Sequence, residues 1–73
     1  MTCSHRYTAR ALRMLAAGCR DEARAWGAKY LQACVEPGQT LPGERDEMRA
    51  RRDCFDRIAN ELNRAAHAQE AER

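Results

Sequence analysis

An eight-residue segment near the middle of the chain constrains the fold more than any other feature. Residues 36–43 contain two prolines and two glycines, Pro37, Gly38, Pro42 and Gly43. Proline has no amide N–H to donate within a helix, and glycine is entropically costly there, so this segment cannot continue a helix. The sequence therefore predicts an all-α fold in which a Pro/Gly loop over residues 36–43 joins two helical halves.

A seven-residue apolar repeat predicts that the second half is one long amphipathic helix over residues 41–68. The repeat is carried by Met48, Phe55 and Leu62, with Ile58, Ala59, Ala65 and Ala66 on the same side. Thr40 is the predicted N-cap, because its hydroxyl can accept from a free amide of the first turn. The polar end of the chain, residues 69–73, is predicted to fray.

The first helical half, residues 5–35, allows two interpretations. A continuous helix would place one set of residues on a single arc: Leu12, Leu15, Ala16, Cys19, Ala23, Trp26, Tyr30 and Cys34. Against this, Gly18 is followed by Asp21 and Glu22, which is typical of one helix ending and another beginning. The fold is therefore a small antiparallel bundle, either three helices with a break near Gly18 or a two-helix hairpin. The break is slightly favoured, because glycine within a helix costs about 1 kcal/mol relative to alanine.

The segment after Gly18, residues 19–23, resembles the turn between the paired helices of a tetratricopeptide repeat. The resemblance covers only residues 12–35, and Tyr30 stands where that repeat would have a small alanine. No second copy follows at a period of 34 residues. We therefore interpret the pattern as a local helix-turn-helix and not as membership of that family.

The size of the chain predicts association. Residues 1–73 form at most one domain, and a core of this size barely balances the entropy of ordering the chain. A second small-residue strip lies about 100° from the main apolar arc and consists of Tyr7, Ala11, Met14, Gly18 and Ala25. Such a strip allows another helix to approach closely, which predicts a homodimer. The alternative is that three helices within one monomer use both strips.

The cysteines offer little chemistry. Cys3, Cys19, Cys34 and Cys54 form no C-x-x-C pair. In a hairpin, facing residue numbers would add up to about 79, so Cys19 and Cys54 would lie about 9 Å out of register at 1.5 Å per residue. Cys19 and Cys34 are therefore interpreted as small buried hydrophobic residues. Cys3 and His5 form one potential ligand pair, whereas structural zinc normally uses two, so no metal site is predicted.

No motif points to catalysis. The chain has no glycine-rich phosphate loop, no G-x-S-x-G elbow and no H-E-x-x-H pair. The sequence therefore predicts no catalytic residue, no cofactor and no enzyme. No apolar run approaches the ~18 residues that span a bilayer, and residues 1–10 lack the apolar core of a signal peptide, which predicts a cytoplasmic protein.

Charge is distributed unequally between the halves. Residues 1–35 carry six basic and two acidic side chains, a net charge of +4, and residues 36–73 carry seven and nine, a net charge of −2. In a continuous helix the basic residues of the first half would form one stripe: Arg6, Arg10, Arg13, Arg20 and Arg24. Such a stripe can be a solvated face, or it can bind phosphates or an acidic protein surface.

These features predict a helical module that binds a larger protein and inhibits, escorts or tethers it. Small inhibitors carried by phages or other mobile elements are one example of such a module. The predicted partner-binding residues all lie in the first half: Tyr7, Arg10, Arg13, Met14, Arg20, Arg24, Trp26 and Tyr30. The alternative is a nucleic-acid-binding accessory protein that uses the arginine stripe. The protein partner is favoured, because a pI of 8.5 is below the usual value for nucleic-acid-binding domains.

Overall fold

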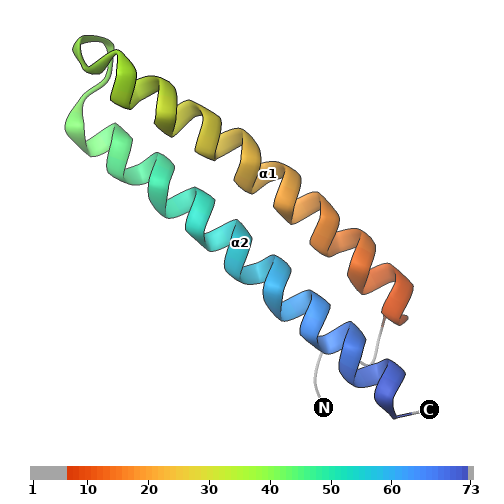
Figure 1. Cartoon of the computed structure of the whole chain (residues 1–73). Coiled ribbons are helices and arrows are strands. Elements are labelled where there is room, and N and C mark those ends of the chain that lie inside the picture. Colours follow the sequence, from red (N-terminus) through yellow and green to blue (C-terminus); the bar gives the residue numbers. More distant parts are fainter. Residues whose placement is uncertain (1–6, 73) are drawn as a thin grey trace.

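The computed structural model describes residues 7–72 as an antiparallel helical hairpin. Helix α1 spans Ala9–Val35, a short 3-10 turn η2 spans Pro37–Gln39, and helix α2 spans Pro42–Ala71. The two long helices lie side by side over their whole length (Figure 1). The molecule measures 53 × 19 × 15 Å, and its radius of gyration is 15.7 Å. A compact chain of this length would have a radius of gyration of about 11 Å, so the hairpin is a rod with a single layer.

Helix α1 is continuous through Gly18, so the favoured three-helix interpretation is wrong and the two-helix hairpin is confirmed. The helix begins at Ala9, where the Thr8 hydroxyl accepts a hydrogen bond from the Ala11 amide at 3.1 Å. Gly18 has no positive φ. Because the apolar arc continues on both sides of Gly18, packing against α2 outweighs the cost of about 1 kcal/mol for a glycine within a helix.

Replacing Gly18 with alanine should therefore stabilise the protein. Apart from its chain neighbours and the nearby backbone of its own helix, a Cβ atom at this position would meet no atom within 4 Å. We expect the free energy of unfolding to rise by about 0.5–1 kcal/mol, because alanine loses less backbone entropy on folding. Thermal denaturation followed by circular dichroism would show a melting temperature a few degrees higher.

The matched control is Gly27→Ala, which should give a smaller gain. Its Cβ would lie 3.3 Å from Cδ of Arg52, so that side chain would have to move slightly. A lower melting temperature for Gly18→Ala would contradict an undistorted helix at this position.

Helix α2 begins differently from the prediction. Leu41, and not Thr40, is the N-cap, and no side chain caps the first turn. The Leu41 carbonyl instead accepts from the amides of Glu44 at 3.0 Å and Arg45 at 3.3 Å. Pro42 occupies the first turn, where an amide N–H would have no partner within the helix, and Glu44 places negative charge at the positive end of the helix dipole.

Helix α2 also ends three residues later than predicted, at Ala71. The helix therefore includes residues 69–71 of the segment predicted to fray. The Gln69 side-chain amide donates to the carbonyl oxygen of Tyr7 at 2.7 Å, which ties the end of α2 to the segment before α1. Within residues 7–72, neither helix has an apolar stretch long enough to span a bilayer.

The helices meet along a seam made mainly of alanine. The buried apolar side chains of the described chain are Leu12, Ala16, Ala23, Ala33, Ala59 and Ala66. Together with half-buried residues they follow alternating steps of four and three residues on both helices, which is the spacing of a coiled-coil interface. Because alanine fills little space, the larger apolar side chains are left at the sides of the seam.

The predicted register is confirmed. Arg20 Nη2 donates to Asn60 Oδ1 at 2.6 Å, and a Cβ on Gly27 would touch Arg52. Facing residue numbers therefore add up to about 80, close to the predicted 79.

Candidate docking surfaces

The alanine seam divides the hairpin surface into two long edges. Residues on one side of the buried alanines form the first edge, and residues on the other side form the second. We call the first the arginine edge: Arg13, Arg20, Arg24, Gly27, Leu31, Arg52, Asp56 and Glu70. We call the second the apolar edge: Leu15, Cys19, Trp26, Phe55, Ile58 and Leu62.

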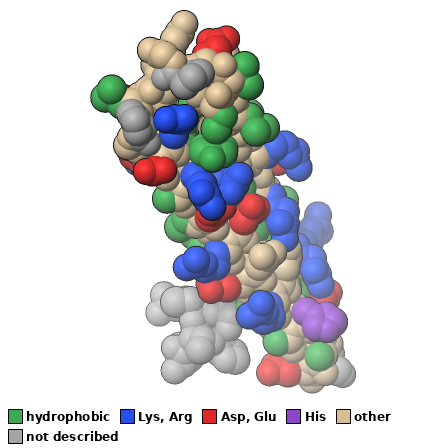
Figure 2. Space-filling view, turned by 60° about the vertical axis from the view of Figure 1, so that its left-hand side comes forward, with side chains coloured by type: hydrophobic (Ala, Val, Ile, Leu, Met, Phe, Trp, Pro, Cys, Tyr) green, Lys and Arg blue, Asp and Glu red, His purple; other side chains and the backbone are tan. Residues whose placement is uncertain are grey.

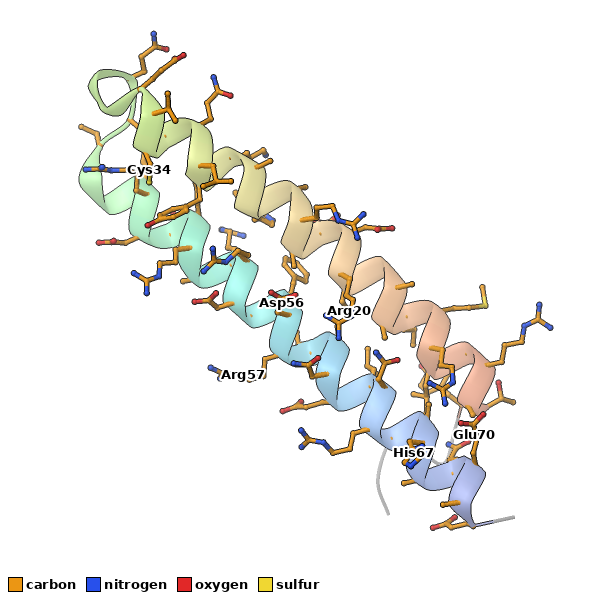
Figure 3. The ribbon with its side chains drawn as sticks, in the orientation of Figure 1. Arg20, Cys34, Asp56, Arg57, His67 and Glu70 are labelled. Carbon is orange, nitrogen blue, oxygen red and sulfur yellow. The ribbon has the colours of Figure 1, made fainter. Side chains whose placement is uncertain are left out.

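Ion pairs cross the seam on the arginine edge. Arg13 pairs with Glu70, and Arg20 Nη1 lies 3.7 Å from Asp56 Oδ1. Figure 3 shows Arg20 and Asp56 directed toward one another from the two helices. These side chains are about half exposed, so each pair contributes at most about 1 kcal/mol. They fix how the two helices align and hold the guanidinium groups at the surface.

A groove of about 460 Å³ lies on this edge and opens to solvent. It is lined by Arg20, Ala23, Arg24, Gly27, Ala28, Leu31, Arg52 and Asp56. Gly27 lacks a side chain, which allows Arg52 to lie across the seam, with its guanidinium carbon 5.6 Å from the centre of the Tyr30 ring. The arrangement combines an apolar floor with cationic walls, and arginine suits the planar recognition of carboxylates.

Arg24 is the most accessible cation in the groove. Its side chain is 81% exposed, and its Nη1 lies 3.8 Å from Asp21 Oδ1. A pair this exposed contributes only a few tenths of a kcal/mol. A carboxylate from another molecule can therefore replace Asp21 at little cost.

The apolar edge exposes large side chains without a covering layer. Leu15 is 48% exposed and Ile58 is 38% exposed. Ile58 lies one helical turn from both Phe55 and Leu62, which are half-buried. The edge therefore presents apolar side chains from both helices near the middle of the hairpin.

Two cations lie over the Trp26 ring, at the end of the apolar edge nearest the loop. Lys29 Nζ lies 4.4 Å from the centre of the Trp26 ring, and the Arg51 guanidinium carbon lies 5.0 Å from it. Cation–π contacts of this kind contribute about 0.5–1 kcal/mol at exposed sites. Arg51 also donates to Glu47 Oε1 at 2.7 Å.

The surface as a whole carries mixed charge. In Figure 2 the basic side chains lie along the visible face with acidic side chains beside them. No family model, no curated protein and no solved structure matches the chain. Its function therefore has to be inferred from the two edges.

The structure does not bring all the predicted binding residues together. Four of them form one group along the arginine side of α1: Arg10, Arg13, Arg20 and Arg24. Tyr30 and Trp26 are half-buried and partly covered by cations. Tyr7 and Met14 are 49% and 67% exposed and do not line the groove. The predicted residues therefore do not all line the groove, and Arg6 lies outside the described residues.

Sequence reasoning missed Arg52, Leu31 and Asp56 as groove residues. One signal was available for Arg52, which occupies a position where the seven-residue repeat of α2 calls for an apolar side chain. Leu31 gave no signal, because it lies outside the main apolar arc.

The cysteines differ from the prediction. Cys19, Cys34 and Cys54 are free thiols, and Cys34 and Cys54 are exposed. The expectation that Cys34 is buried is wrong, because it follows the seam residue Ala33 and points to the side at the loop end of the hairpin (Figure 3). No group of three or more His, Cys, Asp and Glu side chains among residues 7–72 could hold a metal ion. Cys3 and His5 lie outside the described residues.

Proposed function

We propose that this chain is a helical docking module that binds a larger protein through the groove on its arginine edge and thereby inhibits, escorts or tethers it. The observation that carries the proposal is the combination of an apolar floor and three guanidinium groups in one open groove. Arginine beside apolar contact area is the composition typical of protein–protein hot spots.

The groove defines the chemistry of the partner surface. Leu31 is 64% exposed and offers an apolar contact at one wall. Arg20, Arg24 and Arg52 outnumber Asp56, so the lining carries a net charge of +2. The partner is therefore a protein ridge or helix with an apolar side chain flanked by carboxylates.

One feature favours this proposal over nucleic-acid binding. The arginine stripe is interrupted by Glu70, Asp56 and Asp21, each of which pairs with one of its arginines. A polyanion would have to displace all three carboxylates. The free thiols of Cys34 and Cys54 suit a reducing compartment, which supports a cytoplasmic location.

Replacing Arg24 with glutamate tests the proposal. We expect this variant to bind its protein partner about tenfold more weakly, because it reverses the most accessible charge of the groove. The Arg24 side chain is 81% exposed and its ion pair is with Asp21 of the same helix, so the hairpin should fold as before. The measurement is capture from a lysate of the source organism on the immobilised chain, followed by titration of the recovered protein against each variant.

Arg57→Glu is the matched control, because Arg57 is exposed and points away from α1 (Figure 3). It makes the same charge change outside the groove and should leave binding unchanged. Equal losses for both variants would contradict a groove-specific contact. Tight binding of a DNA duplex, with a steep salt dependence that Arg24→Glu reduces, would support the nucleic-acid alternative instead.

A further inference from the structure

We propose that the apolar edge is covered by a second copy of this chain, so that two hairpins form a four-helix bundle with their loops at opposite ends. This inference goes beyond the docking function, because it uses the edge on the other side of the seam. The arginine grooves of the two copies would then remain open on the outside of the assembly.

The area left uncovered by one hairpin matches what a dimer needs. The accessible surface is 5705 Å². A compact chain of 8.3 kDa would expose about 4,600 Å², so the hairpin exposes about 1,100 Å² more. A stable interface buries about 800 Å² on each partner. Two stacked layers are also the usual minimum for a domain, whereas one hairpin has one layer.

The register of the hairpin makes the apolar edge complementary to itself. Because the numbers of facing residues add up to about 80, Ile58 of α2 lies at the same level along the hairpin as Glu22 of α1. We take this level as the centre of the hairpin. Along α1, Leu15 and Lys29 are each seven residues from Glu22, so they lie about 10 Å from the centre in opposite directions. A two-fold axis through the centre would bring Ile58 of the copies together. It would also place Leu15 of each copy against the Trp26 ring and the Lys29 methylene groups of the other.

Repulsion between cations of the two copies favours the orientation with the loops at opposite ends. If both loops were at the same end, Lys29 and Arg51 of the two copies would lie at one level and repel each other. With the loops at opposite ends, these cationic pairs are about 20 Å apart along the bundle. Glu22, which has no ion-pair partner among the described residues, then lies between the two cationic pairs.

The test is the oligomeric state of the full chain and of three variants, measured by sedimentation over about a hundredfold range of concentration. We expect the wild-type protein to have twice the chain mass of 8.3 kDa and to dissociate on dilution. Ile58→Glu should raise the dissociation constant at least a hundredfold, because the change occurs twice near the axis. Leu15→Glu, whose side chain is 48% exposed, should also weaken the dimer.

Leu31→Glu is the control, since Leu31 is 64% exposed but lines the arginine groove. It should remain dimeric, and circular dichroism should show the same helix content in all variants. A wild-type protein that is monomeric at every concentration would overturn the proposal, as would a dimer disrupted by Leu31→Glu but not by Ile58→Glu. A monomer that still binds its partner through Arg24 would leave the docking function standing.

Orientation is tested with a spin label on Cys34, in a chain whose other cysteines are replaced by serine. Cys34 lies at the loop end and is exposed. It is twelve residues from the central level, so two labels should be about 36 Å apart along the bundle. A distance below about 20 Å would place both loops at one end and overturn the proposed orientation.

Discussion

Replacing Leu12 with alanine should lower the free energy of unfolding by about 2 kcal/mol. Leu12 is 2% exposed and is the one buried side chain larger than alanine in the described chain. We place the effect at the lower end of the usual range for a buried leucine, because Leu12 lies in the first turns of α1, where the helix end can relax into the space. For a chain of this size, the melting temperature should fall by about 10 °C.

Leu31→Ala is the matched control for this prediction. It removes the same atoms from a side chain that is 64% exposed, so the melting temperature should change little. Both variants should be measured at one protein concentration, because association would otherwise change the apparent stability. Equal effects at the two positions would show that Leu12 is not packed against α2.

Local sequence patterns predicted the architecture but not the number of helices. The prolines and glycines of residues 36–43 placed the loop, and the seven-residue repeat of Met48, Phe55 and Leu62 placed α2. The error at Gly18 arose because a local propensity of about 1 kcal/mol was weighed without the packing of the whole arc against α2. Propensity signals of this size are commonly overridden by tertiary contacts.

The helix ends were harder to predict because their partners are distant in sequence. Gln69 holds the end of α2 by donating to the carbonyl of Tyr7, which is 62 residues away. At the other end of α2, Thr40 has the side chain of a good cap, but the turn at η2 leaves Leu41 in the cap position.

For the groove on the arginine edge, the sequence predicted residues of α1 but none of α2. The spacing of Arg13, Arg20 and Arg24 put them on one face of α1 once the helix was continuous. Arg52 and Asp56 join them because the register sets α2 beside them, and the predicted register was applied only to the cysteines and not to the arginine face. The two aromatic residues among the predicted binding residues, Trp26 and Tyr30, are half-buried and lie against cations of the same chain.

Replacing Ala59 with leucine should destabilise the hairpin by about 3 kcal/mol. Ala59 has no exposed surface and lies in the middle of α2. The register places it opposite the part of α1 between Ala16 and Ala23, which are also buried. A leucine here can fit only if the helices separate, and separation removes the contacts of the neighbouring alanines as well. Urea denaturation at fixed protein concentration measures the loss as a lower midpoint.

Ala50→Leu provides the comparison, because Ala50 is exposed on the outer side of the same helix. Leucine and alanine have similar helix propensities, so this variant should change the midpoint only slightly. The difference between the two variants isolates the close approach of the helices from the change in side-chain chemistry. If Ala59→Leu were as stable as Ala50→Leu, the helices could not be packed along an alanine seam, and the large apolar side chains would have to lie between them.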